Sequence, residues 1–260
     1  MRIDNDAFIR EVLDLYVKNP CQISSIAFWK MEKIFLECET YRFIDNGHFY
    51  LYAIRNNRFE FYWSDDIQRF FLTQDEIEAW DFFVLHENYY KLITESFKGY
   101  EKRNCKPLIY DFNFSQGNKI IEEFYIADFD FANEGDFVYA AELLNRCYKN
   151  QNHDAEEIAG WCRQPEFDES LWIWARSSVS NKVVGLGIST YQESIKETYL
   201  DWIQVLPKYQ RNGIGRMLVG ETVHRAIDKS DIMRVTGMAD GFYQKCGFRG
   251  TENWRILAKK

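Results

Sequence analysis

The 260-residue chain contains only four prolines and lacks both a long apolar run and a secretory leader. No apolar stretch approaches the roughly 18 residues that a membrane-spanning helix requires. The N-terminus carries acidic residues within its first turn and has no uninterrupted apolar core of the signal-peptide kind. These absences predict a cytoplasmic protein without a membrane partner.

Metal-ligand patterns are also missing. The six cysteines form no C-x-x-C pair, and the four histidines do not combine with them at the spacings of a zinc site. We therefore expect reduced, mostly buried thiols and no metal ion.

An excess of basic residues is lacking as well. The chain has 32 Lys and Arg against 40 Asp and Glu, a formal net charge of −8. Proteins that bind nucleic acid usually present a basic face, so we expect no nucleic-acid partner. An acidic protein is compatible with a cationic small molecule or a basic peptide. The 46% apolar and 17% aromatic content indicates a folded globular protein.

Glycine is scarce in the first half, with four of the 14 residues before position 150 and ten after it. Tight turns and close backbone approaches are therefore expected mainly in the second half. The polar, turn-prone segments 98–106 and 115–119 indicate a boundary near residue 118. We predict two domains, residues 1–118 and residues 119–260.

The first region is predicted to be an α+β domain of unknown role. Apolar spacing predicts a helix over residues 3–17, and a hairpin is expected over residues 48–63 around Asn56 and Asn57. A further helix is predicted from Thr73 or Gln74 into the nineties. No catalytic motif is found in this region.

The second region alternates between strand and helix patterns. Strands are predicted at 124–131, 171–176, 183–191, 198–206, 232–237 and 254–258, and helices at 137–148, 155–162, 214–228 and 242–245. Gly247 is predicted to be the left-handed cap of the last helix. This order predicts a mixed sheet with helices on its faces.

One loop of this region has the features of a phosphate-binding site. A strand ends before Pro207, and an amphipathic helix begins at Ile214. The unpaired amides at a helix N-terminus attract phosphate oxygens, and Gly213 and Gly215 leave room for a close approach. Arg211 and Arg216 are able to add charge-assisted contacts. A plain strand-to-helix turn with two glycines is the competing interpretation.

Two other nucleotide motifs do not fit this loop. A P-loop needs Lys and Ser or Thr after its last glycine, but Arg216 and Met217 follow Gly215. A dinucleotide fingerprint needs a third glycine where Leu218 stands. The pair Gly185 and Gly187 lies inside a predicted strand, which indicates a bulge or close packing.

The segment from Gln210 to Gly215, Gln-Arg-Asn-Gly-Ile-Gly, resembles the Gln/Arg-x-x-Gly-x-Gly/Ala signature of the GNAT N-acetyltransferases. Val205-Leu206-Pro207 is similar to the family's Val-x-Pro. Phe242 to Phe248 is similar to its Phe/Leu-Tyr-x-Lys-x-Gly-Phe segment. The resemblance covers about residues 122–260. It implies an α/β (α+β) fold with a GNAT-like, mostly antiparallel mixed sheet flanked by helices for that region and says nothing about residues 1–118. We expect an additional N-terminal α+β domain there, and a degenerate copy of the same fold that has lost its phosphate loop is a separate hypothesis.

The resemblance implies direct acetyl transfer from acetyl-CoA to a primary amine in a ternary complex, without a covalent enzyme intermediate. It also implies a set of residues that bind the coenzyme: Ile203, Val205, Gln210, Arg211, Asn212, Gly213, Ile214, Gly215, Arg216, Thr236 and Tyr243. Thr236 stands where many members of the family have asparagine. The chain ends 12 residues after Phe248, so the last two strands are short or another segment completes the sheet.

Three positions are candidates for the chemistry. The resemblance assigns the amide of Val205 to the acyl carbonyl and the phenol of Tyr243 to the leaving thiolate. Strand alternation places Asp201 on one face with Ile203 and Val205, where it is able to bind the amine or relay its proton. The competing interpretations are a core valine, a solvated or ion-paired acid, and a packed tyrosine. Glu197 is a second choice as the acid, and Cys246 is interpreted as a core residue.

The leading hypothesis is an N-acetyltransferase acting on a small-molecule or peptide amine. The first region then shapes the acceptor site or a homodimer interface. The alternative is a non-catalytic acyl-CoA-binding sensor. The presence of both Asp201 and Tyr243 favours catalysis, because binding of the coenzyme alone requires neither. The acceptor amine is left open.

Overall fold

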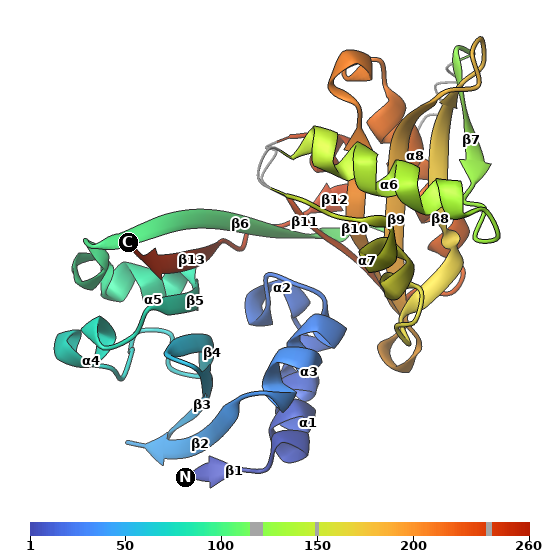
Figure 1. Cartoon of the computed structure of the whole chain (residues 1–260). Coiled ribbons are helices and arrows are strands. Elements are labelled where there is room, and N and C mark those ends of the chain that lie inside the picture. Colours follow the sequence, from blue (N-terminus) through green and yellow to red (C-terminus); the bar gives the residue numbers. More distant parts are fainter. Residues whose placement is uncertain (115–121, 149–150, 238–240) are drawn as a thin grey trace. The chain divides into compact units, whose positions relative to one another are not determined.

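The computed structural model describes residues 1–114, 122–148, 151–237 and 241–260 (Figure 1). The chain folds into two compact units. The first consists of Met1–Ile109 with Thr236–Asp240 and Arg249–Lys260, and the second of Tyr110–Val235 with Gly241–Phe248. The division along the chain therefore falls at residue 110, and the last residues of the chain return to the first unit.

The first unit is built around a mixed sheet. Its elements are β1 (Arg2–Ile3), α1 (Asn5–Tyr16), α2 (Pro20–Ile23), α3 (Phe28–Leu36), β2 (Glu39–Asp45), β3 (His48–Arg55), β4 (Arg58–Ser64), α4 (Gln74–Glu78), β5 (Phe82–His86), α5 (Glu87–Leu92), η1 (Thr94–Phe97), β6 (Tyr100–Tyr110) and β13 (Trp254–Lys259). The strand order is β1-β2-β3-β4-β5-β13-β6. Within it, β4 and β5 are parallel and the other neighbours are antiparallel.

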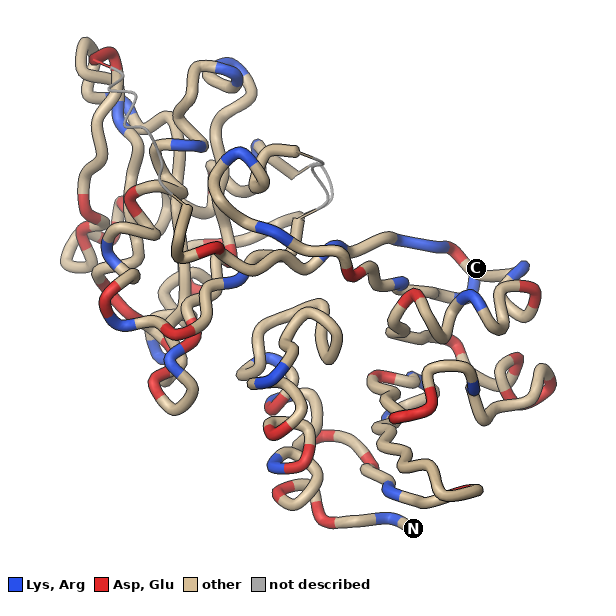
Figure 2. The backbone as a smooth tube through the Cα atoms, turned by 180° about the vertical axis from the view of Figure 1, so that it is seen from behind, with Lys and Arg blue, Asp and Glu red and all other residues tan. Residues whose placement is uncertain are grey.

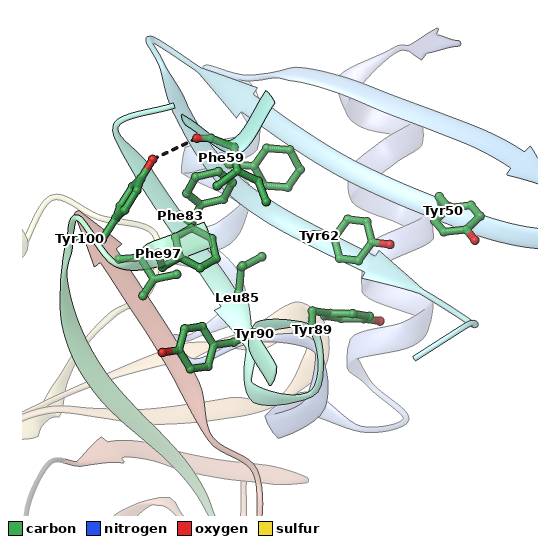
Figure 3. Packing of buried hydrophobic residues seen from close by; sticks show 11 residues of the cluster. Tyr50, Phe59, Tyr62, Phe83, Leu85, Tyr89, Tyr90, Phe97 and Tyr100 are labelled. Carbon is green, nitrogen blue, oxygen red and sulfur yellow. Dashed lines mark hydrogen bonds between the residues drawn. The ribbon is translucent and has the colours of Figure 1, made fainter. Parts of the chain in front are cut away.

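Aromatic residues hold both faces of this sheet. The rings of Phe8 on α1, Phe35 on α3 and Phe61 on β4 meet edge to face. A second cluster contains Phe59, Tyr62 and residues of β5 and α5, all buried (Figure 3). Such rings remove large apolar areas from water and so dominate the stability of a core.

The predicted first helix and hairpin are confirmed as α1 and the β3–β4 pair. Asn56 and Asn57 have φ values of 43° and 63°, the left-handed geometry that suits a two-residue hairpin turn. The helix predicted from residue 73 into the nineties is wrong. Helix α4 ends at Glu78, and the apolar run Phe82–His86 forms β5 between β4 and β13. Residues 82–85 are all apolar, so they lack the apolar–polar alternation of a half-buried strand, and their sequence resembles that of a buried helix.

The second unit repeats the pattern of a helix-flanked sheet. Its elements are β7 (Phe124–Asp128), α6 (Glu134–Cys147), α7 (Ala155–Trp161), β8 (Phe167–Ser177), β9 (Val183–Gln192), η2 (Glu193–Ile195), β10 (Glu197–Val205), η3 (Pro207–Tyr209), α8 (Ile214–Ala226), β11 (Ile232–Gly237), η4 (Tyr243–Cys246) and β12 (Phe248–Arg249). The order β11-β10-β9-β8-β7 is antiparallel except for the parallel pair β10 and β11. The predicted order of strands and helices is confirmed. Gly247, at φ 93°, is the predicted left-handed cap.

Alternate residues of β8 and β9 separate two cores. Trp172 and Trp174 pack with α6 and α7, whereas Ile173 and Ala175 pack with α8. Gly187 leaves room for the side chain of Ile173 on β8, because a Cβ at this position would lie 2.9 Å from Ile173 Cγ1. The predicted close packing at this glycine is confirmed.

The C-terminal strand predicted near residues 254–258 exists, but it pairs inside the sheet of the first unit. In β13, Trp254 lies opposite both His86 on β5 and Cys105 on β6. Its indole Nε1 donates a 2.9 Å hydrogen bond to the carbonyl of Cys21, and Leu257 is fully buried. The residues after Phe248 therefore belong to the first unit.

The two units share one order of elements. Each has a first strand, helices, three antiparallel strands, a helix, a strand parallel to the preceding one, and a further helical turn. Acidic and basic residues are interspersed along the chain in both units (Figure 2). Within the described residues, no helix has the length and apolarity needed to cross a membrane. The described residues also contain no cluster of metal-binding side chains.

Candidate functional site

The end of β10 extends beyond its pairing with β11. The parallel register of these two strands ends at Leu200↔Val235, and β10 continues to Val205. The amide of Leu206 donates to the carbonyl of Val184 on β9. Because amides alternate in direction along an antiparallel strand, those of Ile203 and Val205 point away from β9. They are therefore suited to an extended ligand lying beside β10.

The loop after β10 is held by its own polar side chains. Gln210 Nε2 donates to the carbonyl of Val205 at 3.1 Å, and Asn212 Nδ2 donates to the carbonyl of Tyr209 at 3.2 Å. Arg211 and Gly213 both have left-handed backbone, at φ 69° and 86°. Such φ values favour glycine, so Gly213 is well suited to its position. The loop is exposed and preformed.

The N-terminus of α8 begins without a side-chain cap. Gly213 is its N-cap residue, and its first turn contains no acidic residue. In the same unit, Asn133 caps α6 and Asp154 caps α7 by accepting backbone amides. The first-turn amides and the positive end of the helix dipole at α8 thus remain suited to an anion.

Three segments with family motifs meet at Gly215. A Cβ at this position would lie 3.1 Å from Cζ of Phe242 and 3.8 Å from Cγ2 of Val205. Glycine therefore lets the start of α8 approach both the end of β10 and the residue before η4. Ile214 is buried, while Arg211 and Arg216 are exposed and able to reach a ligand.

Asp201 is the extra residue of a β-bulge. The β9–β10 register shifts between Leu200 and Trp202. Strict alternation therefore stops there, and the predicted shared face of Asp201 with Ile203 and Val205 does not follow from it. Thr190 Oγ1 on β9 donates a 2.8 Å hydrogen bond to Asp201 Oδ2, which orients the carboxylate.

Tyr243 lies at the start of η4 among other aromatic residues. Its ring centroid is 4.9 Å from that of Phe242 and 5.9 Å from that of Phe248. Burial raises the pKa of Tyr243 well above its ordinary value, and the nearby phenols of Tyr148 and Tyr199 raise it further. The phenol is therefore protonated at neutral pH.

Tyr148 was not identified from the sequence. Its hydroxyl accepts a 2.6 Å hydrogen bond from Gln204 Nε2, and its ring contacts Trp202 edge to face. It follows the last residue of α6, so the C-terminal end of that helix lies beside β10 and Tyr243. One feature of the sequence points toward this contact. Gln204 lies between Ile203 and Val205 on β10, so its side chain is expected on the opposite face of the strand.

The remaining candidates have other partners. Thr236, at the end of β11, belongs with Ser25 to the first unit, and its Oγ1 donates to the Ser25 carbonyl. Its contact with a coenzyme stays a prediction. Glu197 is fully buried and lies 3.6 Å from the buried guanidinium of Arg234. Cys246 is fully buried, and burial raises the pKa of its thiol to about 11. Glu197 and Cys246 thus belong to the interior of the second unit.

Comparison with known protein families identifies a domain within the chain. Residues 137–248 match the model of the acetyltransferase (GNAT) family. This second region is a GNAT-family domain. The match includes β10, the Gln210–Gly215 loop and η4. No curated protein sequence matches the chain.

Solved structures extend the likeness beyond the GNAT match. A GCN5-related N-acetyltransferase from Sphaerobacter thermophilus has a TM-score of 0.62 at 12% identity, over 81% of this chain and 75% of that one. A GNAT-family acetyltransferase from Colwellia psychrerythraea has a TM-score of 0.58 at 10% identity, over 100% and 99%. A tandem GNAT protein from the clavulanic acid biosynthesis pathway has 0.61 at 10% identity, over 100% and 97%. At these identities the likeness establishes the fold, including the GNAT-like mixed sheet with an additional N-terminal domain.

Proposed function

We propose that this chain is an N-acetyltransferase that moves an acetyl group from acetyl-CoA to a primary amine in a ternary complex. The observation that carries this proposal is the uncapped N-terminus of α8 beside the open end of β10. The GNAT match to residues 137–248 supports it, since that family binds acyl-CoA.

The residues present fit the coenzyme. The first-turn amides of α8 suit a pyrophosphate, and Arg211 and Arg216 supply positive charge at that end. The outward amides of Ile203 and Val205 suit a pantetheine arm lying along β10 as an added strand. The predicted contacts of Gln210 and Asn212 stay predictions, because both side chains bind backbone carbonyls here.

Acetyl-CoA supplies a thioester, whose carbonyl carbon is attacked directly by the amine. The Val205 amide donates a hydrogen bond to the carbonyl oxygen and stabilises the charge that develops there. Asp201 binds the acceptor ammonium and takes its proton, directly or through water, before the attack. Thr190 keeps the carboxylate in position for that step.

Tyr243 acts on the leaving sulfur. Its raised pKa keeps the phenol protonated but makes it a weaker acid than a thiol, whose ordinary pKa is about 8.5. Tyr243 therefore donates a hydrogen bond to the sulfur as the C–S bond breaks. After the attack, the nitrogen carries one proton more than it has in the amide product. Loss of this proton balances the protonation of the thiolate.

A covalent intermediate on Cys38 or Cys246 does not fit the properties of their thiols. A nucleophilic cysteine needs a lowered pKa, usually through a neighbouring base or cation. Burial instead raises the pKa of Cys38 to about 12 and that of Cys246 to about 11. Direct transfer is therefore the proposed route.

The acceptor is a small-molecule or peptide amine, consistent with the net charge of −8. Tyr148 is proposed to line the acceptor side, because its hydroxyl accepts a hydrogen bond from Gln204 on β10 and its phenol raises the pKa of Tyr243. The cytoplasmic location, the homodimer and the absence of a nucleic-acid partner stay predictions.

Release of free thiol from acetyl-CoA, measured with a panel of amines, tests the proposal. We expect release that depends on one class of amine and yields the acetylated amine by mass spectrometry. Tight binding of acetyl-CoA without release on any amine would instead support the sensor. Absence of binding would contradict both functions.

A further inference from the structure

The fourth strand of each unit carries the same irregularity at the same place. The β3–β4 register skips Glu60 between Phe59 and Phe61, as the β9–β10 register skips Asp201. Each bulged residue is acidic, and each directly follows the last residue that pairs with the parallel strand, Phe59 or Leu200. The two strands can therefore be compared residue by residue.

Counting four residues beyond each bulge makes Ser64 the counterpart of Val205. The following residues behave alike, because the amide of Asp65 donates to the carbonyl of Phe49 on β3, as that of Leu206 donates to β9. The amide of Ser64 therefore points away from β3, in the direction in which Val205 presents its amide.

In the first unit this amide is already used. The hydroxyl of Tyr89 accepts a 3.0 Å hydrogen bond from the amide of Ser64 and donates a 2.9 Å hydrogen bond to the Ser64 carbonyl. Both residues are buried. Figure 3 shows Tyr89 of α5 beside Tyr62 of β4, and their ring centroids are 4.6 Å apart. A side chain of the unit thus occupies the backbone groups that an added strand would need.

The acid of the bulge is also occupied. Glu60 Oε1 accepts hydrogen bonds from Arg55 Nε at 2.9 Å and Arg58 Nε at 2.6 Å, and its side chain is only 4% exposed. Two guanidinium groups neutralise this carboxylate. Glu60 is therefore not available to bind an ammonium.

The start of the following helix is closed and negatively charged. Thr73 caps α4, because its hydroxyl accepts a hydrogen bond from the amide of Glu76. The Glu76 carboxylate in turn accepts a hydrogen bond from the amide of Thr73. Asp75 and Glu76 lie in the first turn of this five-residue helix. A pyrophosphate would meet occupied amides and two carboxylates there.

We propose that the first unit is a second copy of the acyltransferase fold whose coenzyme cleft is closed from within by Tyr89, Glu60 and the Thr73–Glu76 cap. The chain consequently binds one acyl-CoA, in the second unit. This inference rests on the proposed function of the second unit and adds the number and location of its sites.

Equilibrium dialysis of the full chain against radiolabelled acetyl-CoA gives the number of sites. We expect one site per chain. Two sites would overturn the closed copy while leaving the proposed function intact. No site would overturn the proposed function, and the single site with it.

Hydrogen exchange with and without CoA locates the site. We expect slower exchange in peptides covering 203–216 and unchanged exchange in peptides covering 58–76. Protection of 58–76 alone, or of both segments, would overturn the inference. Because each segment is read separately in the intact protein, neither result depends on a variant that folds.

Discussion

At the scale of single residues, the surroundings of a carboxylate decide what it is able to do. Asp201 and Glu60 are both bulged residues of a fourth strand. Thr190 orients Asp201 through a neutral hydroxyl, whereas Arg55 and Arg58 bind Glu60 through charged hydrogen bonds. We propose that the acid at this place handles the proton of the amine in the second unit, while Glu60 holds two arginines in the first.

Replacement of the two acids by their amides separates these roles. We expect Asp201→Asn to lower turnover about 100-fold with little change in melting temperature, because the lost group handles the proton of the amine. Glu60→Gln should keep turnover and lower the melting temperature by roughly 4 °C, because two arginines lose their counter-charge. Steady-state kinetics and thermal unfolding give both values. Loss of turnover in Glu60→Gln would contradict the assignment.

The hydroxyl of Tyr243 provides a second prediction. Tyr243→Phe should lower kcat by about 100-fold and change the Kd of acetyl-CoA by less than about threefold, because the hydrogen bond to sulfur matters mainly as the C–S bond breaks. The exposed Tyr139 is the matched control, and Tyr139→Phe should behave as wild type. Burial raises the pKa of Tyr243 above its ordinary 10.0. At pH values up to 10, the wild type should therefore lose no activity through deprotonation of this phenol. Wild-type kcat in Tyr243→Phe would remove this residue from the mechanism.

At the scale of elements, sequence patterns predict those helices and turns whose residues interact over a few positions of the chain. The Asn56–Asn57 turn and helices α1, α6 and α8 could be predicted because their spacing and turn residues act over a few positions. The sequence of strand β5 resembles that of a helix because its apolar residues do not alternate with polar ones. The bulge at Asp201 is set by pairing with β9, which no local pattern contains.

The contact between α5 and β4 gives a prediction about alkaline stability. Burial raises the pKa of Tyr89 to about 12 in the folded chain, above the ordinary 10.0 of the unfolded one. The folded state therefore keeps a proton that the unfolded state loses, and stability falls as pH rises from about 10 to 12. Two pKa units correspond to roughly 3 kcal/mol for this buried group.

Tyr89→Phe tests this contact by urea unfolding at several pH values. The variant should be about 2 kcal/mol less stable at pH 8, because Ser64 loses both hydrogen bonds. It should also lose less stability than wild type between pH 10 and 12. An equal loss in both proteins would show that Tyr89 does not titrate in the folding equilibrium.

At the scale of the whole molecule, one order of elements occurs twice in the chain. The sequence revealed one copy, because only the second retains the Gln210–Gly215 loop and the Phe242–Phe248 segment. The first copy is recognisable from its strand order and register. It is not recognisable from its sequence, because its side chains at the corresponding positions differ. The pairing of β13 with β5 and β6 joins residues more than 140 positions apart, beyond the reach of local pattern.

The candidate site was predictable to a similar extent. The loop residues and Tyr243 belong to short motifs, and the fold brings Val205, Gly215 and Phe242 together; their role in coenzyme binding stays a prediction. Tyr148 was missed because it approaches β10 only through the packing of α6. Side chains that reach a site across a sheet require the tertiary structure.

Calorimetric titration of CoA into the wild type and two glycine variants tests whether the N-terminus of α8 binds the pyrophosphate of CoA. Gly213→Asp places a carboxylate at the N-cap of α8, and Gly47→Asp makes the same change at a matched φ of 83° in a turn where a Cβ meets nothing within 4 Å. We expect Gly213→Asp to weaken CoA binding by at least about 100-fold, roughly 2.7 kcal/mol, and Gly47→Asp to bind CoA as the wild type does. Unchanged affinity in Gly213→Asp would show that the N-terminus of α8 does not hold the pyrophosphate.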